Sequence, residues 1–598
     1  MTDLTATRTD APAADRPWLD AGLPVDERVE LLLAEMTLEE KAGLFFHTMI
    51  AVGDLAESNP AFGTPSAVDF VESRHMTHFN LLGTAPSAGE IAEWHNALQR
   101  LAASTRLGIP VSLSSDPRHS FSDNPGAAIM AGPFSQWPET MGLAAIGDEE
   151  LVERFADIAR QEYTAVGLRV ALHPQVDLAT EPRWSRAVAT FGEDADLSAR
   201  LGAAYIRGFQ GASFGAGSVS TMTKHFPGGG PQKDGEDPHF AYGREQVYPG
   251  DAFELHLTPF EAAFDAGTRQ VMPYYGMPVG TQYEEVGFGF NKSVITGLLR
   301  ERYGFDGVVC TDWGLLTDAE IFGDRHPARA WGVEHLSPRE RMKKVLDAGA
   351  DQFGGEACPE LLVELVVDGD IAEERLDASA RRLLREKFVL GLFDAPYVDA
   401  EAAGAIVGSP EFRAAGAEAQ RASITVLTNE LIGSVQPTLP LARGLRIYAE
   451  GIPAEIVAEY GVLAQGPKDA DVAILRLKAP FETRATTFEN FFHAGSLDFD
   501  AETIAHVLEV ARAVPTVVDV FLDRPAILTR LVGAASAVVA NWGVSAHALL
   551  DVLTGAAHPK GRLPFDLPRS TAAVEANRPD VPFDTEDPLF RFGHGLPL

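Results

Sequence analysis

The strongest constraint on this chain is an alternation of short apolar runs with amphipathic stretches between residues 75 and 355. Helix-like stretches, with apolar residues three and four positions apart, separate six runs that we interpret as buried strands. The runs are Val111–Ser115, Leu168–Leu172, Ser218–Thr223, Gln270–Tyr274, Gly307–Thr311 and Ala350–Phe353. Alternating strands and helices indicate a parallel sheet, because each parallel crossover needs a long connection. Over roughly 280 residues this alternation favours a (β/α)8 barrel of the TIM type.

A second series of apolar runs follows in the last third of the chain. These runs are Ile424–Leu427, Leu445–Tyr448, Val472–Leu477, Thr516–Leu522 and Ala537–Ala540. Their spacing predicts an open, doubly wound α/β sandwich domain. We therefore expect a flexible segment at 1–22, a barrel domain at 23–393, a linker at 394–415 and a sandwich domain at 416–598. The end of that domain is rich in proline and aspartate, which predicts a segment that wraps over a surface.

The amino-acid composition excludes some classes of binding partner. The 598 residues include 85 acidic and 49 basic side chains, a formal net charge of −36, so phosphate backbones and anionic lipids repel the chain. No apolar run approaches the ~18 residues of a membrane span, and residues 1–22 lack the apolar core of a secretory signal. We expect a cytoplasmic protein that binds neither nucleic acid nor membrane. Self-association into a homodimer is compatible with this composition.

Cysteine usage adds little chemistry. Cys310 and Cys358 are too few for a disulfide framework and lack the spacing of metal ligands. We expect neither a metal nor an organic cofactor.

The most informative motif is Asp312-Trp313-Gly314, directly after the apolar run Gly307–Thr311. In a barrel, residues that follow the strands face the active site. A carboxylate accepts hydrogen bonds from hydroxyls or attacks an anomeric carbon, and an indole stacks on the ring of a sugar. The alternative is that Asp312 caps the next helix and Trp313 only packs.

Three other predicted strands also end in polar residues. Asp116 follows the first run, Arg183 lies beyond the second, and Lys224 and His225 follow the third. Each could equally be a solvated loop residue. Together with Asp312, however, they would meet at one barrel mouth, and that joint pattern predicts a polar site for a small hydroxylated ligand.

In these motifs the sequence resembles glycoside hydrolase family 3. The matching segments are Arg106–Pro110, Pro182–Trp184, Thr190–Asp194, Lys224–Gly228, Gly304–Trp313, Pro525–Leu528, Gly561–Phe565 and Phe592–Leu596. The resemblance covers nearly the whole chain, from about Val25 to Leu598. It implies a barrel followed by an α/β sandwich, which agrees with the fold predicted above.

The resemblance also implies roles for individual residues. Asp312 would be the nucleophile of a retaining double displacement, with no cofactor. The sugar would be bound by Asp116, Arg183, Lys224, His225, Tyr275 and Trp313. In place of the Ala-Val-His-Gly that often follows the first aspartate in the family, this chain has residues 117–120, Pro-Arg-His-Ser. That departure concerns the shape of the sugar site.

The general acid/base is the least defined role. Two-domain members of the family usually supply a glutamate after a strand of the second domain, but Pro480 stands at that position here. Glu482, two residues later, is our first candidate and Glu489 our second. A third candidate is His239 with Asp237, because family 3 N-acetylglucosaminidases use a His–Asp pair in the corresponding loop. Each of these residues could instead lie on a solvated loop.

The residues indicate an exo-acting glycosidase without fixing its sugar. The expected activity is that of a β-glucosidase acting on small glycosides or oligosaccharides. A β-xylosidase or α-L-arabinofuranosidase would need the same motifs, and a β-N-acetylhexosaminidase or phosphorylase would use His239. From another class, a catalytically silent sugar-binding protein would explain Pro480.

Overall fold

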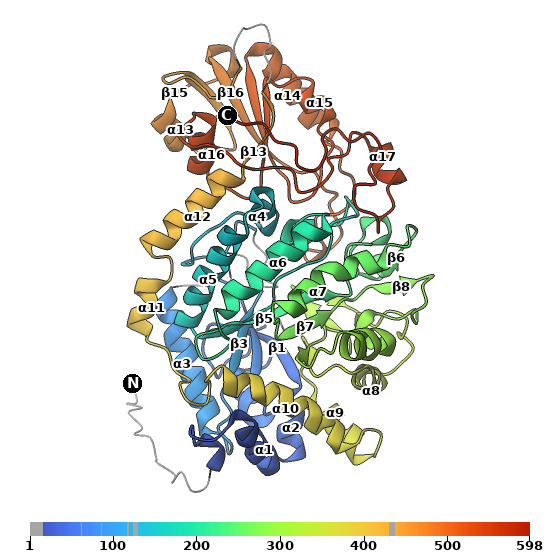
Figure 1. Ribbon diagram of the computed structural model, residues 1–598. Coiled ribbons are helices and arrows are strands. Elements are labelled where there is room, and N and C mark those ends of the chain that lie inside the picture. Colours follow the sequence, from blue (N-terminus) through green and yellow to red (C-terminus); the bar gives the residue numbers. More distant parts are fainter. Residues whose placement is uncertain (1–15, 61–62, 85–86, 117–118, 123–129, 430–436) are drawn as a thin grey trace.

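The computed structural model describes residues 16–60, 63–84, 87–116, 119–122, 130–429 and 437–598 (Figure 1). Most of the segment predicted to be flexible, 1–22, lies outside these residues. The described part, 16–22, includes a short 3₁₀ helix, Pro17–Leu19, whose Trp18 side chain is buried. Arg28 donates a hydrogen bond to the Trp18 carbonyl at 2.7 Å. Within the described part of this segment, Trp18 is therefore packed against the barrel domain.

The first domain is the predicted α/β barrel. Its sheet has eight parallel strands in the order β12-β1-β2-β3-β4-β5-β7-β9. A further parallel bridge between Cys310 and Gln352 joins the two ends of the sheet. The strands are β1 (Phe46–Ala51), β2 (His78–Leu82), β3 (Ser112–Ser115), β4 (Leu168–Ala171), β5 (Ser220–Phe226), β7 (Gln270–Pro273), β9 (Val308–Val309) and β12 (Phe353–Gly354).

Two of these strands, β1 and β2, were not predicted. Both carry polar residues inside the strand, among them His47, His78 and Asn80, and all three are buried. His47 Nε2 lies 2.7 Å from the Ser114 hydroxyl on β3. Polar side chains that bond to one another inside the barrel break the apolar run on which strand prediction depends.

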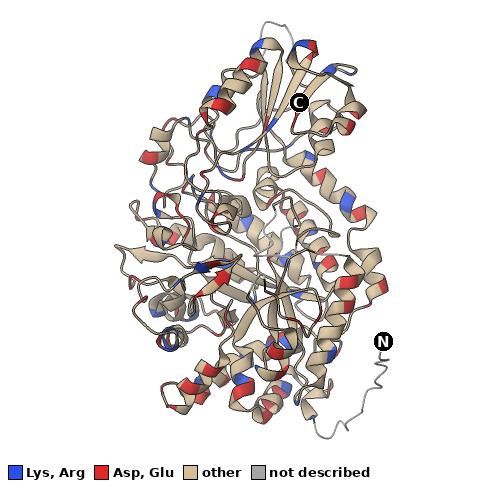
Figure 2. Ribbon diagram, turned by 180° about the vertical axis from the view of Figure 1, so that it is seen from behind, with Lys and Arg blue, Asp and Glu red and all other residues tan. Residues whose placement is uncertain are grey.

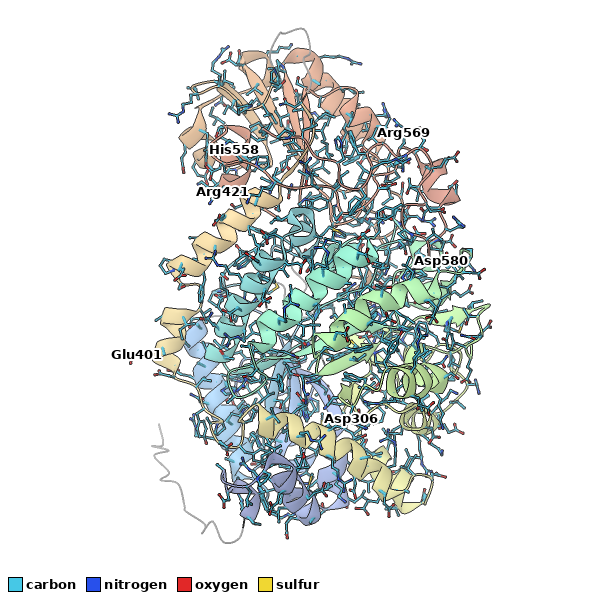
Figure 3. All side chains as sticks on the ribbon, in the orientation of Figure 1. Asp306, Glu401, Arg421, His558, Arg569 and Asp580 are labelled. Atoms are coloured by element: carbon cyan, nitrogen blue, oxygen red, sulfur yellow. The ribbon has the colours of Figure 1, made fainter. Side chains whose placement is uncertain are left out.

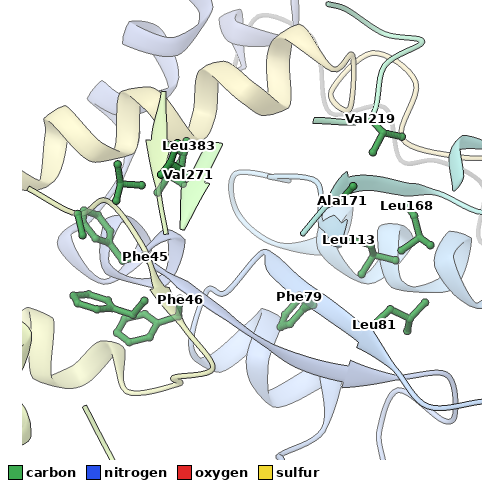
Figure 4. Close-up of a cluster of buried hydrophobic side chains, with 14 of the residues drawn as sticks. Phe45, Phe46, Phe79, Leu81, Leu113, Leu168, Ala171, Val219, Val271 and Leu383 are labelled. Atoms are coloured by element: carbon green, nitrogen blue, oxygen red, sulfur yellow. The ribbon is translucent and has the colours of Figure 1, made fainter. Parts of the chain in front are cut away.

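Helices surround the barrel sheet. They include α3 (Ala88–Ser104), α5 (Glu149–Ala165), α6 (Ala195–Gln210), α7 (Thr258–Asp265), a π-helix (Ser293–Arg302), α8 (Pro338–Ala348), α9 (Pro359–Val367) and α10 (Glu373–Val389). Apolar side chains of strands such as Phe46, Leu113 and Val271 pack between sheet and helices, as Figure 4 shows. At the lower end in Figure 1, α1 (Val25–Glu35) and α2 (Leu38–Leu44) lie against α10. A capping box between Thr37 and Glu40 begins α2.

The predicted linker is largely helical. It contains α11 (Ala400–Ile406) and the beginning of α12 (Pro410–Ser423). Helix α11 packs on α3 and α5, and α12 packs on α4 (Thr140–Ile146) and on α16 (Ala546–Leu553) of the second domain. The two helices therefore run along the barrel up to the second domain (Figure 1).

The second domain has a six-stranded sheet in the order β13-β18-β17-β16-β14-β15. The strands are β13 (Thr425–Asn429), β14 (Arg446–Glu450), β15 (Val462–Leu463), β16 (Val472–Lys478), β17 (Thr516–Phe521) and β18 (Ala537–Asn541). Helices α13 (Ala454–Tyr460), α14 (Ala501–Ala513), α15 (Thr529–Val532) and α16 accompany it. Strand β13 is antiparallel to β18, which the sequence did not reveal because an apolar run carries no direction.

The last segment of the chain returns to the barrel. Both carboxylate oxygens of Glu193, in the barrel domain, accept backbone hydrogen bonds, one from Asp566 and one from Phe583. The Asp580 carboxylate accepts from the backbone N–H of Gly250 and Ala252 at 2.9 Å each. Gly192 fits against the Pro564 carbonyl, where a Cβ would lie 2.2 Å from the oxygen. Two motifs from the sequence, 190–194 and 561–565, therefore meet at the contact between the domains.

In the view of Figure 2, acidic and basic residues are interspersed over the outer helices. Among the described residues, no helix combines the length and the apolar character that a membrane crossing requires.

Candidate active site

A cavity of about 380 Å³ lies where the barrel strands end and the second domain begins. We call the barrel side its floor, comprising Asp116, Arg186, Lys224 and Asp312. We call the second-domain side its roof, comprising Phe488, Phe491, Phe492, His493 and Asp523. His239, Tyr275 and Trp313 also line the cavity. The position is the one that both a barrel and a doubly wound sheet use for ligands.

Asp312 is a buried carboxylate, and only one of its two oxygens accepts a hydrogen bond from a described residue. Its Oδ1 accepts a hydrogen bond from the Trp313 N–H at 2.8 Å. Its Oδ2 is buried, has no hydrogen-bond partner among the described residues and lies 3.8 Å from His225 Nε2. An acceptor without a partner is costly to bury, by ~1–3 kcal/mol. This oxygen is therefore available to a ligand or to a reacting carbon atom.

Asp177 holds His225 in place. The Nδ1 atom of His225 lies 2.7 Å from Asp177 Oδ2, and its Nε2 has no partner among the described residues. Burial lowers the pKa of His225 far below its usual value, so the ring is neutral and carries its proton on Nδ1. Burial also raises the pKa of Asp177 to about 6, although hydrogen bonds from the backbone N–H groups of Gly229 and His225 act to lower it. The Nε2 lone pair is free to accept a hydroxyl hydrogen.

Lys224 and Asp116 form a second buried pair. Lys224 Nζ donates to Asp116 Oδ1 at 2.8 Å, and His173 Nε2 lies 2.7 Å from the same oxygen. Burial lowers the pKa of Lys224, although Asp116 opposes this. An ammonium beside a carboxylate offers a donor and an acceptor to adjacent hydroxyls of one ring.

Of the two arginines in the motif 183–186, Arg186 is the one that lines the cavity. Its Nη1 atom is buried without a hydrogen-bond partner among the described residues. Burial alone would lower the pKa of Arg186, but Tyr274, Asp237 and Asp312 outweigh it and raise the pKa. The predicted Arg183 instead pairs with Glu181 at 2.8 Å.

Tyr275 and Trp313 lie beside the nucleophile candidate. The Tyr275 hydroxyl donates to the Trp313 carbonyl at 2.7 Å, and the indole lies 5.4 Å from the His47 ring. The sequence predicted both residues for this site, and both line the cavity.

The three acid/base candidates occupy different surroundings. His239 lines the cavity, and its Nδ1 lies 2.6 Å from Asp237 Oδ1. Glu482 has a side chain that is 56% exposed and accepts from the Ser496 N–H at 3.1 Å. Glu489 accepts from the Tyr242 hydroxyl at 3.1 Å. Among the described residues that line the cavity there is no glutamate.

Comparison with known proteins agrees with this geometry. The model of the glycosyl hydrolase family 3 N-terminal domain matches residues 79–386, and that of the C-terminal domain matches residues 332–597. The chain belongs to glycoside hydrolase family 3. It is therefore a glycosidase, an enzyme that hydrolyses O-glycosyl bonds.

Relatives of this family 3 enzyme are named for activity on glucosides. A probable β-glucosidase C of Aspergillus oryzae is 52% identical over 97% of this chain and 91% of its own length. A periplasmic β-glucosidase/β-xylosidase of Dickeya chrysanthemi is 42% identical, with the same coverage of 97% and 91%. The crystal structure of a β-glucosidase from Listeria innocua in complex with isofagomine has a TM-score of 0.75 and 22% identity, covering 96% of this chain and 83% of that one. This structural likeness concerns the fold.

The sequence analysis did not single out two residues of this candidate site, Asp177 and Arg186. Arg186 lies three residues after the predicted Arg183, but an irregular loop has no period that tells which of two arginines faces inward. Asp177 was not predicted because it is hydrogen-bonded to His225, which is distant from it in the sequence.

Proposed function

We propose that this family 3 glycosidase is a retaining, exo-acting β-glucosidase that releases terminal β-D-glucose from small glycosides and oligosaccharides. The observation that carries the proposal is the unpartnered Asp312 Oδ2, buried beside His225, Lys224 and Arg186. The names of the relatives with 52% and 42% identity support glucose as the sugar.

The mechanism follows from these groups. The non-reducing glucosyl unit lies over the floor, where Lys224, Asp116, Arg186 and His225 exchange hydrogen bonds with its hydroxyls. Asp312 Oδ2 attacks the anomeric carbon while the acid/base gives a proton to the departing oxygen, so the glycosidic bond breaks as a glycosyl–Asp312 ester forms. The acid/base then takes a proton from water as the water oxygen attacks the anomeric carbon, and the ester bond breaks to release glucose and the Asp312 carboxylate. Two inversions give overall retention.

We propose His239 as the acid/base, oriented by Asp237. Support comes from its place in the cavity wall and its bond to Asp237. An imidazole can both give and accept a proton. Burial lowers the pKa of His239, and Asp237 opposes this. Glu482 and Glu489 remain predictions, to be tested against His239.

A panel of p-nitrophenyl glycosides tests the function. We expect fastest hydrolysis of the β-D-glucoside, with the β-D-xyloside second because the Dickeya relative bears both names. Proton NMR should show β-glucose as the first product. Preference for the α-L-arabinofuranoside or the N-acetyl-β-D-glucosaminide, or turnover accelerated by phosphate, would contradict the proposal. Sugar binding without any hydrolysis would favour the silent alternative.

We further propose that the protein acts in the cytoplasm on imported glycosides. Both cysteines, Cys310 and Cys358, are free and buried, which makes no demand on an oxidising compartment. The Dickeya relative is named periplasmic, so fractionation of cells that produce the protein is the deciding measurement. The homodimer also remains a prediction, for light scattering to test.

A further inference from the structure

The roof of the cavity carries a histidine–carboxylate pair that the mechanism above does not use. Asp523 follows β17, and His493 lies in the loop after β16. Both line the cavity. His493 Nδ1 is hydrogen-bonded to Asp523 Oδ2. The Asp523 residue is only 8% exposed, and its Oδ1 is buried with no hydrogen-bond partner among the described residues. Asp312 Oδ2 on the floor is likewise a buried carboxylate oxygen without a hydrogen-bond partner among the described residues.

The pair is held in a fixed position. The imidazole of His493 stacks on Phe481 with ring centroids 4.0 Å apart and planes 7° from parallel. Arg524, next to Asp523, donates to the carbonyls of Pro480 and Ala494 in the same loop at 2.7 and 3.1 Å. It also donates across the domain boundary to the Arg183 carbonyl at 2.9 Å. This arginine therefore fixes the loop to the barrel.

The chemistry of the pair suits hydroxyl groups. The Nδ1 atom of His493 is hydrogen-bonded to Asp523 Oδ2, so His493 Nε2 and Asp523 Oδ1 are both left for the hydroxyls of a ligand. Phe491 and Phe492, in the same loop, add apolar faces to the cavity, and Phe492 packs 4.5 Å from the ring of the acid/base candidate His239. Acceptors for hydroxyls beside flat apolar faces match the two sides of a sugar ring.

We propose that His493 and Asp523 bind hydroxyls of a leaving sugar and so make the enzyme prefer disaccharides and short oligosaccharides over glucosides with a hydrophobic aglycone. The inference rests on the proposed function. The floor holds the glucosyl unit that Asp312 attacks, so the leaving group extends toward the wall that the second domain supplies. The buried Asp523 Oδ1 then gains the partner that the free enzyme lacks.

The test compares cellobiose with p-nitrophenyl β-D-glucoside in Asp523→Asn and His493→Gln. We expect kcat/KM for cellobiose to fall about tenfold to a hundredfold in Asp523→Asn, the size of one lost hydrogen bond to a charged group. The fall should be smaller in His493→Gln. For the aryl glucoside, and for inhibition by glucose, both variants should stay within about twofold of wild type. Asp498→Asn is the matched control, since Asp498 is an exposed residue of the same loop that bonds to Thr571.

The outcomes separate this inference from the proposed function. An equal loss on both substrates in a variant that melts like wild type would mean that the pair acts on the cleaved unit, and this would overturn the inference. Unchanged cellobiose turnover in both variants would overturn it as well. Should Asp523→Asn not fold, His493→Gln decides by the same comparison. Wild-type enzyme that cleaves no glucoside would instead remove the proposed function.

Discussion

The floor and the roof of the cavity hold their side chains in different ways. On the floor, Asp116, Lys224 and Asp312 stand at or just after barrel strands, and all three are at most 7% exposed. On the roof, the loop after β16 is irregular, and its side chains are fixed by Arg524 and by packing between rings. Strands therefore place these floor residues, whereas contacts within a loop place the roof residues that follow β16.

The largest expected effect concerns the floor. Asp312→Asn removes the nucleophile while keeping its shape, so kcat/KM for p-nitrophenyl β-D-glucoside should fall by ~10⁴-fold or more, as when other covalent nucleophiles are removed. The matched control is Asp306→Asn, before the same strand. Asp306 lies at the surface near α10 (Figure 3), where it pairs with Arg382 at 2.8 Å. Comparable turnover by wild type and Asp312→Asn would remove the assigned nucleophile.

A second experiment asks which side supplies the acid/base. If His239 does, His239→Ala should lower kcat for cellobiose by ~10²–10⁴-fold, while Glu482→Gln and Glu489→Gln stay near wild type. Azide should restore turnover of an activated aryl glucoside by His239→Ala and yield β-glucosyl azide. A large loss and azide rescue in either glutamate variant would move the role to the second domain.

The dependence of kcat/KM on pH also tests whether His239 of the barrel domain is the acid/base. Burial lowers the pKa of His239 from 6.5, with Asp237 opposing. The acid must be protonated when the bond breaks, and its protonated fraction falls as the pH rises through this pKa. The alkaline limb of kcat/KM for cellobiose should therefore lie below pH 6.5 and vanish in His239→Ala. A limb well above that pH would point to another proton donor.

The smallest expected effect is a change in KM, caused by breaking an ion pair between a loop of the second domain and a loop of the barrel domain. Arg484 of the second domain pairs with Glu236 of the barrel domain at 2.8 Å. Partly exposed ion pairs contribute ~0.2–1 kcal/mol, so Arg484→Met should raise KM for cellobiose by less than about fivefold and leave kcat unchanged. Arg446→Met, which breaks a pair inside the second domain, should leave KM unchanged. Equal KM values in both variants would show that this contact does not position the roof.

Much of the fold could be predicted from the alternation of apolar runs and amphipathic stretches, with β1, β2, β15 and the direction of β13 as exceptions. Strands β3, β4, β5 and β7 were predicted from their alternation with amphipathic stretches, although polar residues such as Ser112, Arg169 and Thr221 lie within them. Strand β1 lies before that alternation begins and β2 lies at its start, and both were missed. The short edge strand β15 and the direction of β13 leave no mark in a run of apolar residues.

The residues of the candidate site also fall into those that the sequence predicted and those that it did not. Asp116, Lys224, His225 and Asp312 were predicted because a strand end is visible in the sequence and fixes where the next side chain lies. Arg183 and Arg186 lie three residues apart on a loop, and nothing local decides between them. Asp177 and Asp523 are hydrogen-bonded to histidines that are distant in the sequence.

The sequence by itself determined that strands and helices alternate, that polar residues follow several strands, and that the chain resembles a glycosidase family. These features depend on residues close together in the chain, where periodicity and spacing act directly. Only the tertiary structure decided which arginine enters the cavity, which acid/base candidate faces it, and that Asp523 reaches it from the other domain. Those outcomes depend on how loops from two domains pack, and the cost of leaving a buried polar group unpaired appears only once the chain is folded.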